Sequence, residues 1–99
     1  MILITGSVIA RPDTFDDMLA ASLDHVRRSR AEPGCLAHDV SADCENPLKL
    51  VFVEKWRDRA AVAAHFKVEA SIEFVRAARM LAAAPPVIEI FDAVKVDVA

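Results

Sequence analysis

Short segments of strand-like composition alternate along this chain with longer segments in which apolar residues recur at helical spacing. Residues 2–10 are rich in Ile, Leu, Val and Thr, which is typical of a β-strand. Apolar residues within 15–26 fall on one helical stripe, and this pattern predicts a helix that continues to about Arg30. The Pro33-Gly34 pair ends that helix, because proline cannot continue it.

The middle of the chain predicts a β-hairpin. Residues 35–42 and 48–56 both have strand composition, and a turn marked by Asn46-Pro47 joins them. Side chains alternate between two faces along the second of these strands. One face is predicted to carry Leu50, Phe52, Glu54 and Trp56, and the other Lys49, Val51, Val53 and Lys55.

Two helical segments and a last strand complete the pattern. Asp58 is a suitable N-cap for a short helix through Phe66, and a second helix is predicted over 69–81. Residues 87–96 are predicted to form the last strand. The order strand, helix, strand, strand, helix, strand predicts an α+β fold of the ferredoxin-like βαββαβ type, in which the helices cover one face of a four-stranded antiparallel sheet.

Length and composition predict one domain, residues 1–99, that associates with a second copy. Hydrophobic residues make up 55% of the chain, and both faces of several predicted strands are largely apolar. The face without helices must therefore be covered. A homodimer that packs sheet against sheet covers it, and two-fold homodimers are the commonest assemblies.

Composition also argues against several classes of function. The net charge of −3 and the lack of a basic stripe argue against nucleic-acid binding, and no apolar run is long enough to span a membrane. Cys35 and Cys44 form no CxxC pair, so no metal site is predicted, and a reduced cytoplasmic location is expected. With only two glycines, the chain has no glycine-rich loop for a nucleotide, and no flavin or nicotinamide cofactor is predicted.

Glu54 and His65 are the candidate catalytic residues. Glu54 is a carboxylate on an otherwise apolar strand face. It is either a general base or pocket carboxylate, or one half of a salt bridge to Arg57, Arg59 or a helix arginine, and the pattern alone favours the salt bridge. His65, near the end of the short helix, is either a proton-transfer group or a histidine that hydrogen-bonds a free helix carbonyl.

The remaining candidates are aromatic, aliphatic or histidine side chains. Trp56 offers a flat wall for an aromatic ligand, although a tryptophan at a strand end is more often part of the core. Phe52 and Leu50 share its strand face and are further candidate binding residues. His38 and Asp39 are neighbours on a strand, so their side chains point to opposite faces, and we predict that His38 is exposed. His25 is predicted at the boundary of the first helix's apolar stripe.

Two motifs make the chain similar to a known family. They are Glu32-Pro33-Gly34-Cys35 and Glu54-Lys55-Trp56-Arg57-Asp58, the latter followed by Ala60 and His65, and both Phe74 and Pro85-Pro86 fit the same pattern. With these motifs the chain resembles, over nearly its whole length, the antibiotic biosynthesis monooxygenase domain family, which includes cofactor-independent quinol monooxygenases.

The resemblance implies a ferredoxin-like protomer that forms a dimeric α+β barrel, with a cavity between the sheet and the helices of each protomer. It implies a cofactor-independent monooxygenase that oxidises an aromatic phenol or quinol-like small molecule with O₂, without metal or flavin. Glu54 and Trp56 would line the cavity, with Phe52 and Phe74 as further substrate-binding residues. His65 would lie at the mouth of the cavity, and Glu54 or His65 would assist deprotonation of the substrate.

The chain also departs from the family pattern. Residues 68–71 stand where many members carry a second histidine, and the chain has no tyrosine. Heme-degrading relatives use an asparagine on the first strand. The only asparagine here is Asn46, in a turn, so heme degradation is disfavoured. Two other hypotheses therefore remain open. One is a non-enzymatic barrel dimer that binds a small ligand, and the other is an isomerase of a small carbonyl compound.

Overall fold

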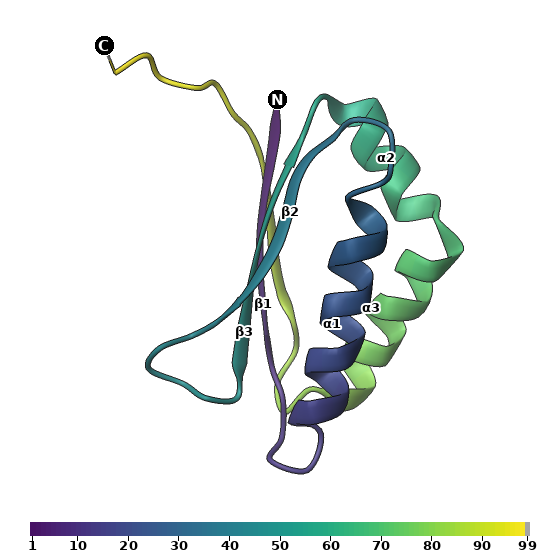
Figure 1. The fold of residues 1–99 in the computed structure, drawn as a ribbon, viewed down its shortest axis with the longest axis vertical. Helices are drawn as coiled ribbons and strands as arrows, with labels where there is room; N and C mark the ends of the chain where they lie inside the picture. Colours follow the sequence, from purple (N-terminus) through teal and green to yellow (C-terminus); the bar gives the residue numbers. More distant parts are fainter. Residues whose placement is uncertain (99) are drawn as a thin grey trace.

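The computed structural model describes residues 1–98, and its elements follow the predicted order. They are β1 (Ile2–Ile9), α1 (Phe15–Ser29), β2 (Cys35–Ala42), β3 (Lys49–Trp56), α2 (Arg59–Lys67), α3 (Glu69–Leu81) and β4 (Val87–Asp92). The three helices lie together on one face of the sheet, as Figure 1 shows. The predicted ferredoxin-like α+β fold is confirmed.

The four strands form one antiparallel sheet in the order β2-β3-β1-β4. The register sets Glu54 of β3 between Ile4 of β1 and His38 of β2. Side chains that are directly opposite each other on neighbouring strands point to the same face. Glu54, Ile4 and His38 therefore all point toward the helices.

The last strand is shorter than the sequence predicted. β4 ends at Asp92, which pairs with Ile2, the first residue of β1. Beyond that pair Met1 and Ala93 form two further hydrogen bonds. The backbone N–H of Ala93 donates to the carbonyl of Met1, and the N-terminal ammonium of Met1 donates to the carbonyl of Ala93. Residues 94–96 were predicted to continue the strand. They extend past the start of β1, so no strand backbone lies opposite them for pairing.

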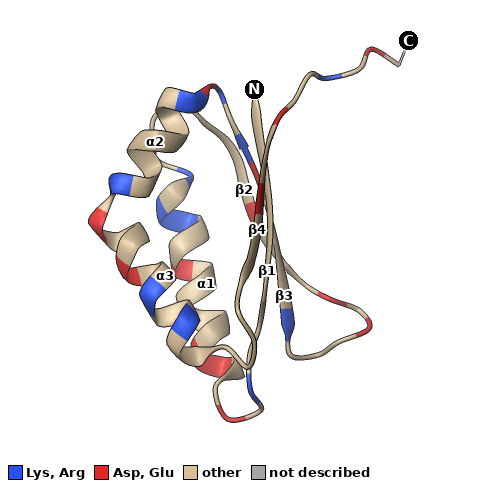
Figure 2. Ribbon diagram, turned by 180° about the vertical axis from the view of Figure 1, so that it is seen from behind, with Lys and Arg blue, Asp and Glu red and all other residues tan. Residues whose placement is uncertain are grey.

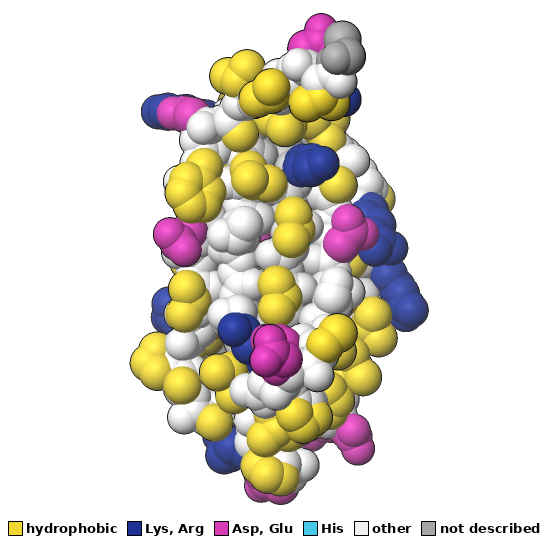
Figure 3. All heavy atoms as spheres, turned by 90° about the vertical axis from the view of Figure 1, so that its left-hand side faces the viewer, with side chains coloured by type: hydrophobic (Ala, Val, Ile, Leu, Met, Phe, Trp, Pro, Cys, Tyr) yellow, Lys and Arg dark blue, Asp and Glu magenta, His cyan; other side chains and the backbone are white. Residues whose placement is uncertain are grey.

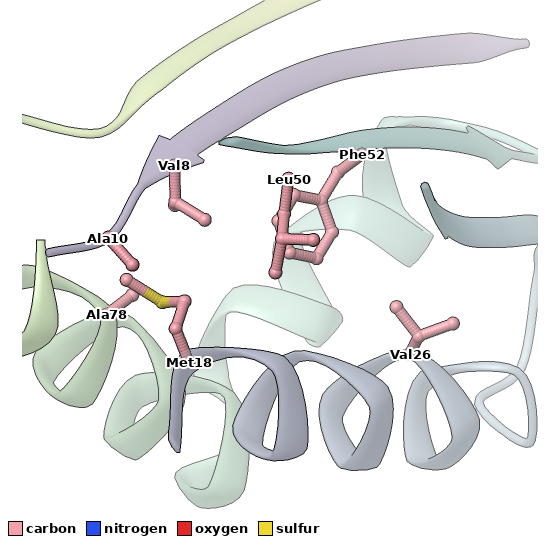
Figure 4. Packing of buried hydrophobic residues seen from close by; sticks show 7 residues of the cluster. All are labelled: Val8, Ala10, Met18, Val26, Leu50, Phe52 and Ala78. Atoms are coloured by element: carbon pink, nitrogen blue, oxygen red, sulfur yellow. The ribbon is translucent and has the colours of Figure 1, made fainter. Parts of the chain in front are cut away.

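The core lies between the helices and the sheet in two clusters. Figure 4 shows the larger cluster, in which Met18 of α1 points toward residues of the sheet and of α3. Its members are Val8, Ala10, Met18, Val26, Leu50, Phe52 and Ala78. The smaller cluster surrounds Trp56 and contains Ile2, Ile4, Ala61 and Val62. Burial along β3 alternates as predicted, with Leu50, Phe52, Glu54 and Trp56 on the helix side.

Two loop residues fix where α2 begins. Gly34 has a φ of 82°, in the left-handed region that favours glycine. A Cβ atom at Gly34 would lie 2.6 Å from the Cβ of Ala61, so this loop approaches α2 closely. Asp58 caps α2, because its side chain accepts a hydrogen bond of 2.9 Å from the backbone N–H of Ala61. The predicted cap is confirmed.

The other face of the sheet carries no helix. Figure 3 shows this face, on which hydrophobic side chains are interspersed with charged ones of both signs. Val53, Val87 and Phe91 belong to it by register, and 39%, 55% and 44% of their surfaces are exposed in the single chain. The homodimer that would cover this face stays a prediction.

Charged side chains of both signs lie along the helices and in the loops, as Figure 2 shows. One ion pair, between Arg59 and Asp92, connects the start of α2 to the end of β4. Among the helices of residues 1–98, none is long and apolar enough to cross a membrane.

Candidate active site

Glu54 is a buried carboxylate at the centre of the sheet, only 8% exposed. Its Oε1 atom accepts a hydrogen bond of 2.9 Å from the indole Nε1 of Trp56. The same oxygen lies 3.1 Å from Nε2 of His38, although this contact is not aligned as a hydrogen bond, and 4.0 Å from Nε2 of His65. The prediction of a salt bridge between Glu54 and an arginine is wrong, because none of the ion pairs within residues 1–98 joins Glu54 to an arginine.

The environment of Glu54 keeps this carboxyl group ionised. Burial raises the pKa of Glu54, but the contacts with His38, Trp56 and His65 outweigh burial and bring the pKa below its ordinary value. Glu54 is therefore a carboxylate at neutral pH, and it can accept protons or hydrogen bonds from a neighbour.

His65 lies between two carboxylates. Its ring is 3% exposed, its Nδ1 atom is 2.8 Å from Oε1 of Glu32, and its Nε2 atom points toward Glu54. An ionised carboxylate can only accept, so Nδ1 carries the proton donated to Glu32, and in the neutral ring Nε2 carries the lone pair. The alternative that placed His65 against a free helix carbonyl is wrong, since its ring nitrogen bonds to Glu32 instead.

His38 is buried, and the prediction of an exposed position for it is wrong. Only 1% of its surface is accessible, and the exposed neighbour is Asp39, which pairs with Arg30. The reason is the strand register, which sets His38 opposite Glu54 on the helix side of the sheet.

His25 of α1 is also buried, at 5% exposed, rather than at a boundary. Its ring stacks on that of Phe74 of α3, with the ring centres 4.1 Å apart and the planes 8° from parallel. Burial, together with the nearby His38 and His65, lowers the pKa of His25 to about 3. His25 is therefore a neutral imidazole throughout the physiological pH range.

The three histidines form one cluster. Their ring centres are 5.1 Å apart for His25 and His38, 5.4 Å for His25 and His65, and 5.6 Å for His38 and His65. Nδ1 of His25 and both ring nitrogens of His38 have no hydrogen-bond partner among the described residues. A buried polar atom without a partner lowers stability by about 1–3 kcal/mol, so this cluster destabilises the fold if its role is purely structural.

A cavity of about 660 Å³ opens beside this cluster, between the sheet and the helices. Its polar wall includes His25, His65 and Glu54, and Phe52 and Phe74 contribute aromatic surface. Further apolar lining comes from Val8, Phe66, Ile72, Val75, Ala78, Met80, Pro86, Val87 and Ile88. A flat apolar ligand can thus bind with its polar groups against a carboxylate and two imidazoles.

Four of the six predicted site residues line this cavity, and two do not. Glu54, His65, Phe52 and Phe74 are in its wall, whereas Trp56 and Leu50 are 0% and 1% exposed and belong to the core. Trp56 instead supports the site from behind. Its indole bonds to Glu54 and packs against the ring of His65 at 4.5 Å between ring centres.

Sequence reasoning missed three residues of this site. Glu32 was noticed only as part of a motif, yet it is the partner of the imidazole of His65. His25 and His38 were judged from their own segments, and their convergence depends on packing between distant elements. A signal existed for His38, because the hairpin that was predicted brings it opposite Glu54.

Comparison with known proteins agrees with this fold. The family model described as antibiotic biosynthesis monooxygenase matches residues 1–77. A Synechocystis protein, "Uncharacterized protein sll1783", is 33% identical over 90 residues, which are 91% of this chain and 61% of that protein. The Bacillus subtilis protein "Putative monooxygenase YcnE" is 28% identical over 85 residues, covering 86% of this chain and 90% of its own. The chain thus spans about three fifths of the length of its Synechocystis relative.

Solved structures show the same architecture. A crystal structure of an antibiotic biosynthesis monooxygenase superposes with a TM-score of 0.87 at 29% identity, covering 96% of this chain and all of that one (100%). A Deinococcus radiodurans protein superposes with a TM-score of 0.92 at 21% identity, covering 98% and 96% of the two chains, and this likeness shows the fold alone. From the family match and these likenesses, the chain belongs to the antibiotic biosynthesis monooxygenase family.

Proposed function

We propose that the protein is a cofactor-independent monooxygenase that oxidises an aromatic phenol or quinol-like small molecule with O₂. The observation that supports this most is the position of His65, with Nδ1 bonded to Glu32 and Nε2 directed toward Glu54, in the wall of a cavity of about 660 Å³. Membership in the monooxygenase family supports the reaction class.

The first step in this proposal is deprotonation of the substrate. Nε2 of His65 accepts the proton of a phenolic hydroxyl, and Glu32 stabilises the imidazolium that forms, because its carboxylate lies 2.8 Å from Nδ1. Glu54 supplies a second negative charge near the same ring. Both carboxylates lie close enough to the ring to interact with the positive charge that forms on it.

The second step belongs to the substrate itself. The phenolate is electron-rich and reduces O₂, and oxygen bonds to the ring carbon opposite or adjacent to the original hydroxyl. One oxygen atom stays on that carbon as a carbonyl, and the other leaves as water with the two hydrogens lost by the substrate. All electrons come from the substrate, so no external reductant is needed. Phe52, Phe74 and the other apolar residues of the wall keep bulk water away from the anion.

A second candidate function is binding of a flat aromatic ligand without turnover. The observation that favours it is the apolar character of most of the cavity wall, which binds a hydrophobic ring whether or not a proton is transferred. An isomerase of a small carbonyl compound remains a third candidate, because His65 and Glu54 form a pair that can move protons.

We also propose that the protein acts as a homodimer that packs sheet against sheet. Exposed Val53, Val87 and Phe91 on the face without helices support this association. The cavity lies on the opposite side of the sheet, among the helices and β4, and Val87 on the edge strand β4 belongs both to its lining and to the proposed interface.

The experiment that tests the activity measures oxygen uptake by metal-stripped protein with hydroquinones, naphthols and anthrones, with autoxidation subtracted. Saturable uptake and one atom of ¹⁸O from ¹⁸O₂ in the product are expected. Product formed equally well without oxygen would replace the proposal by the isomerase. Tight binding of the same compounds, detected by fluorescence of Trp56, with no uptake across the panel would replace it by the ligand-binding function.

A further inference from the structure

The three buried histidines come from elements that meet at one end of the molecule. His25 lies in α1, His38 in β2 and His65 in α2, and Figure 1 shows α2 close to the end of α1 and the start of β2. One ring nitrogen from each histidine can be chosen so that all three atoms lie within 4.8 Å of one another. We propose that His25, His38 and His65 bind one first-row divalent transition-metal ion, for which Zn²⁺ is the reference case.

The spacing of the rings fits such an ion. Three imidazoles around a tetrahedral Zn²⁺, with Zn–N bonds of about 2.05 Å, have ring centres about 5.2 Å apart. The distances here are 5.1, 5.4 and 5.6 Å. The ligand nitrogens of such a site lie about 3.3 Å apart, so rotations that move each nitrogen inward by about 1 Å complete it.

The ring nitrogens without partners also fit a metal site. A metal ion binds the lone pair of a neutral imidazole nitrogen. Both nitrogens of His38 and Nδ1 of His25 are buried without a hydrogen-bond partner within residues 1–98, and a metal ion would supply one.

Carboxylates surround the cluster as they do in protein metal sites. A ligating histidine usually donates its second ring N–H to a carboxylate, which fixes the ring and increases its basicity. Glu32 accepts from Nδ1 of His65 in this way and leaves Nε2 free for the ion. Glu54, with Oε1 at 3.1 Å from Nε2 of His38 and 4.0 Å from Nε2 of His65, adds a negative charge that offsets the charge of the ion.

The proposed site opens toward the cavity. His25, His65 and Glu54 belong to the cavity wall, so a ligand in the cavity reaches the remaining coordination position. Three protein ligands with one open position are the arrangement of metal sites that exchange ligands. The sequence prediction that no metal is bound considered cysteine spacing, whereas these ligands are histidines far apart in the chain.

Metal binding would inhibit the proposed function, but the two proposals are tested separately. An ion bound to Nε2 of His65 removes the lone pair that the metal-free mechanism uses to deprotonate the substrate. Failure of either proposal leaves the other standing, because metal binding is measured without turnover.

The experiment titrates tag-free, metal-stripped protein with Co²⁺ and then with Zn²⁺. We expect one Co²⁺ per chain, visible absorption bands of a site with low coordination number, and their loss when Zn²⁺ displaces Co²⁺. The chain has three histidines, so imidazole NMR resonances of the wild-type protein report each ligand. All three should shift together on addition of Zn²⁺, and this readout needs no variant.

Variants then assign the ligands. His38→Gln should abolish stoichiometric binding, and Glu32→Gln should weaken it about 10–100-fold by releasing the ring of His65. The matched controls are Asp39→Asn, on the exposed side of the same strand, and Cys44→Ser, an exposed thiol. Binding that does not saturate at one ion per chain, imidazole resonances that do not move, or loss of binding in Cys44→Ser would each overturn the proposal.

Discussion

At the scale of single residues, the site depends on one carboxylate–imidazole contact. Nδ1 of His65 bonds to Glu32, so the tautomer and the ring orientation are fixed before a substrate arrives. Trp56 fixes Glu54 in the same way from the other side. These contacts connect a loop, a helix and a strand, which explains why spacing within one segment did not indicate them.

Removal of the carboxylate of Glu32 should slow turnover. Glu32→Gln keeps the size of the side chain but no longer stabilises the His65 imidazolium, so kcat should fall about 10–100-fold, with a smaller change in KM. The measurement is the initial rate of oxygen uptake as a function of pH. Asp39→Asn, which changes an exposed carboxylate paired with Arg30, is the control and should keep wild-type kcat. An unchanged kcat in Glu32→Gln would remove Glu32 from the mechanism.

His25 should make the protein less stable as the pH falls. Its pKa is about 3 when folded and about 6.5 in the unfolded chain, so the unfolded state binds more protons between these values. The contribution of His25 to stability is therefore fully present above pH 6.5 and is lost as the pH falls toward 3. Between pH 6.5 and 5 the loss amounts to about 2 kcal/mol.

The measurement for His25 is urea unfolding at several pH values, together with the NMR titration of its ring. We expect the ring resonances of His25 to stay constant from pH 8 to about 5, while the midpoint of unfolding falls. In His25→Gln the part of this pH dependence due to His25 should disappear. A ring that titrates near pH 6.5 in the folded protein would contradict the account.

At the scale of elements, the position of α2 decides where His65 points. The chain leaves β3 at Trp56, and α2 starts three residues later under the Asp58 cap. Gly34 lies against the first turn of α2 with a positive φ, a combination that only glycine satisfies. The glycine of the Glu32-Pro33-Gly34-Cys35 motif is therefore there for backbone conformation and close packing, and the glutamate for its contact with His65.

Loss of the helix cap should cost measurable stability. Asp58→Ala removes the acceptor for the N–H of Ala61, and the free energy of unfolding should fall by about 1 kcal/mol. Asp58→Asn keeps an acceptor at the same position and should fall by much less. Urea unfolding of the three proteins distinguishes these cases. If Asp58→Ala and Asp58→Asn were equally destabilised, the effect would come from charge rather than from capping.

The positions of most strands and helices could be predicted from the sequence. The repeat of apolar residues located each strand and helix, because periodicity depends on local burial. The limit appears where two elements far apart in the chain meet. The stack of His25 on Phe74 joins α1 to α3, and the contact of His65 with Glu32 joins α2 to a loop. Neither contact leaves a periodic pattern in the sequence. The predicted hairpin brings His38 opposite Glu54, but the sequence prediction placed His38 at an exposed position.

At the scale of the whole molecule, the two faces of the sheet have different roles in this account. The helix side holds the core, the histidine cluster and the cavity. The other side presents Val53, Val87 and Phe91 to solvent in the single chain. An exposed apolar sheet face of this kind is typical of an interface.

A charge on the open face should weaken the proposed dimer. In a two-fold interface each substitution occurs twice, so Val53→Lys should raise the dimer dissociation constant more than 10-fold through lost apolar burial and two unpaired charges. Light scattering across a dilution series measures this. Ala64→Lys, at an exposed position of α2, is the control and should stay dimeric. A wild-type chain that is monomeric at all concentrations would contradict the proposed association.

The central claim is that His65 takes a proton from a substrate bound in the cavity. The most direct test is oxygen uptake at saturating substrate by wild-type protein and by His65→Ala, both stripped of metal. We predict that kcat falls about 10²–10⁴-fold in His65→Ala, while the substrate still binds. If His65→Ala and Glu54→Gln both turned over an accepted substrate at the wild-type rate, the account of the site would be wrong.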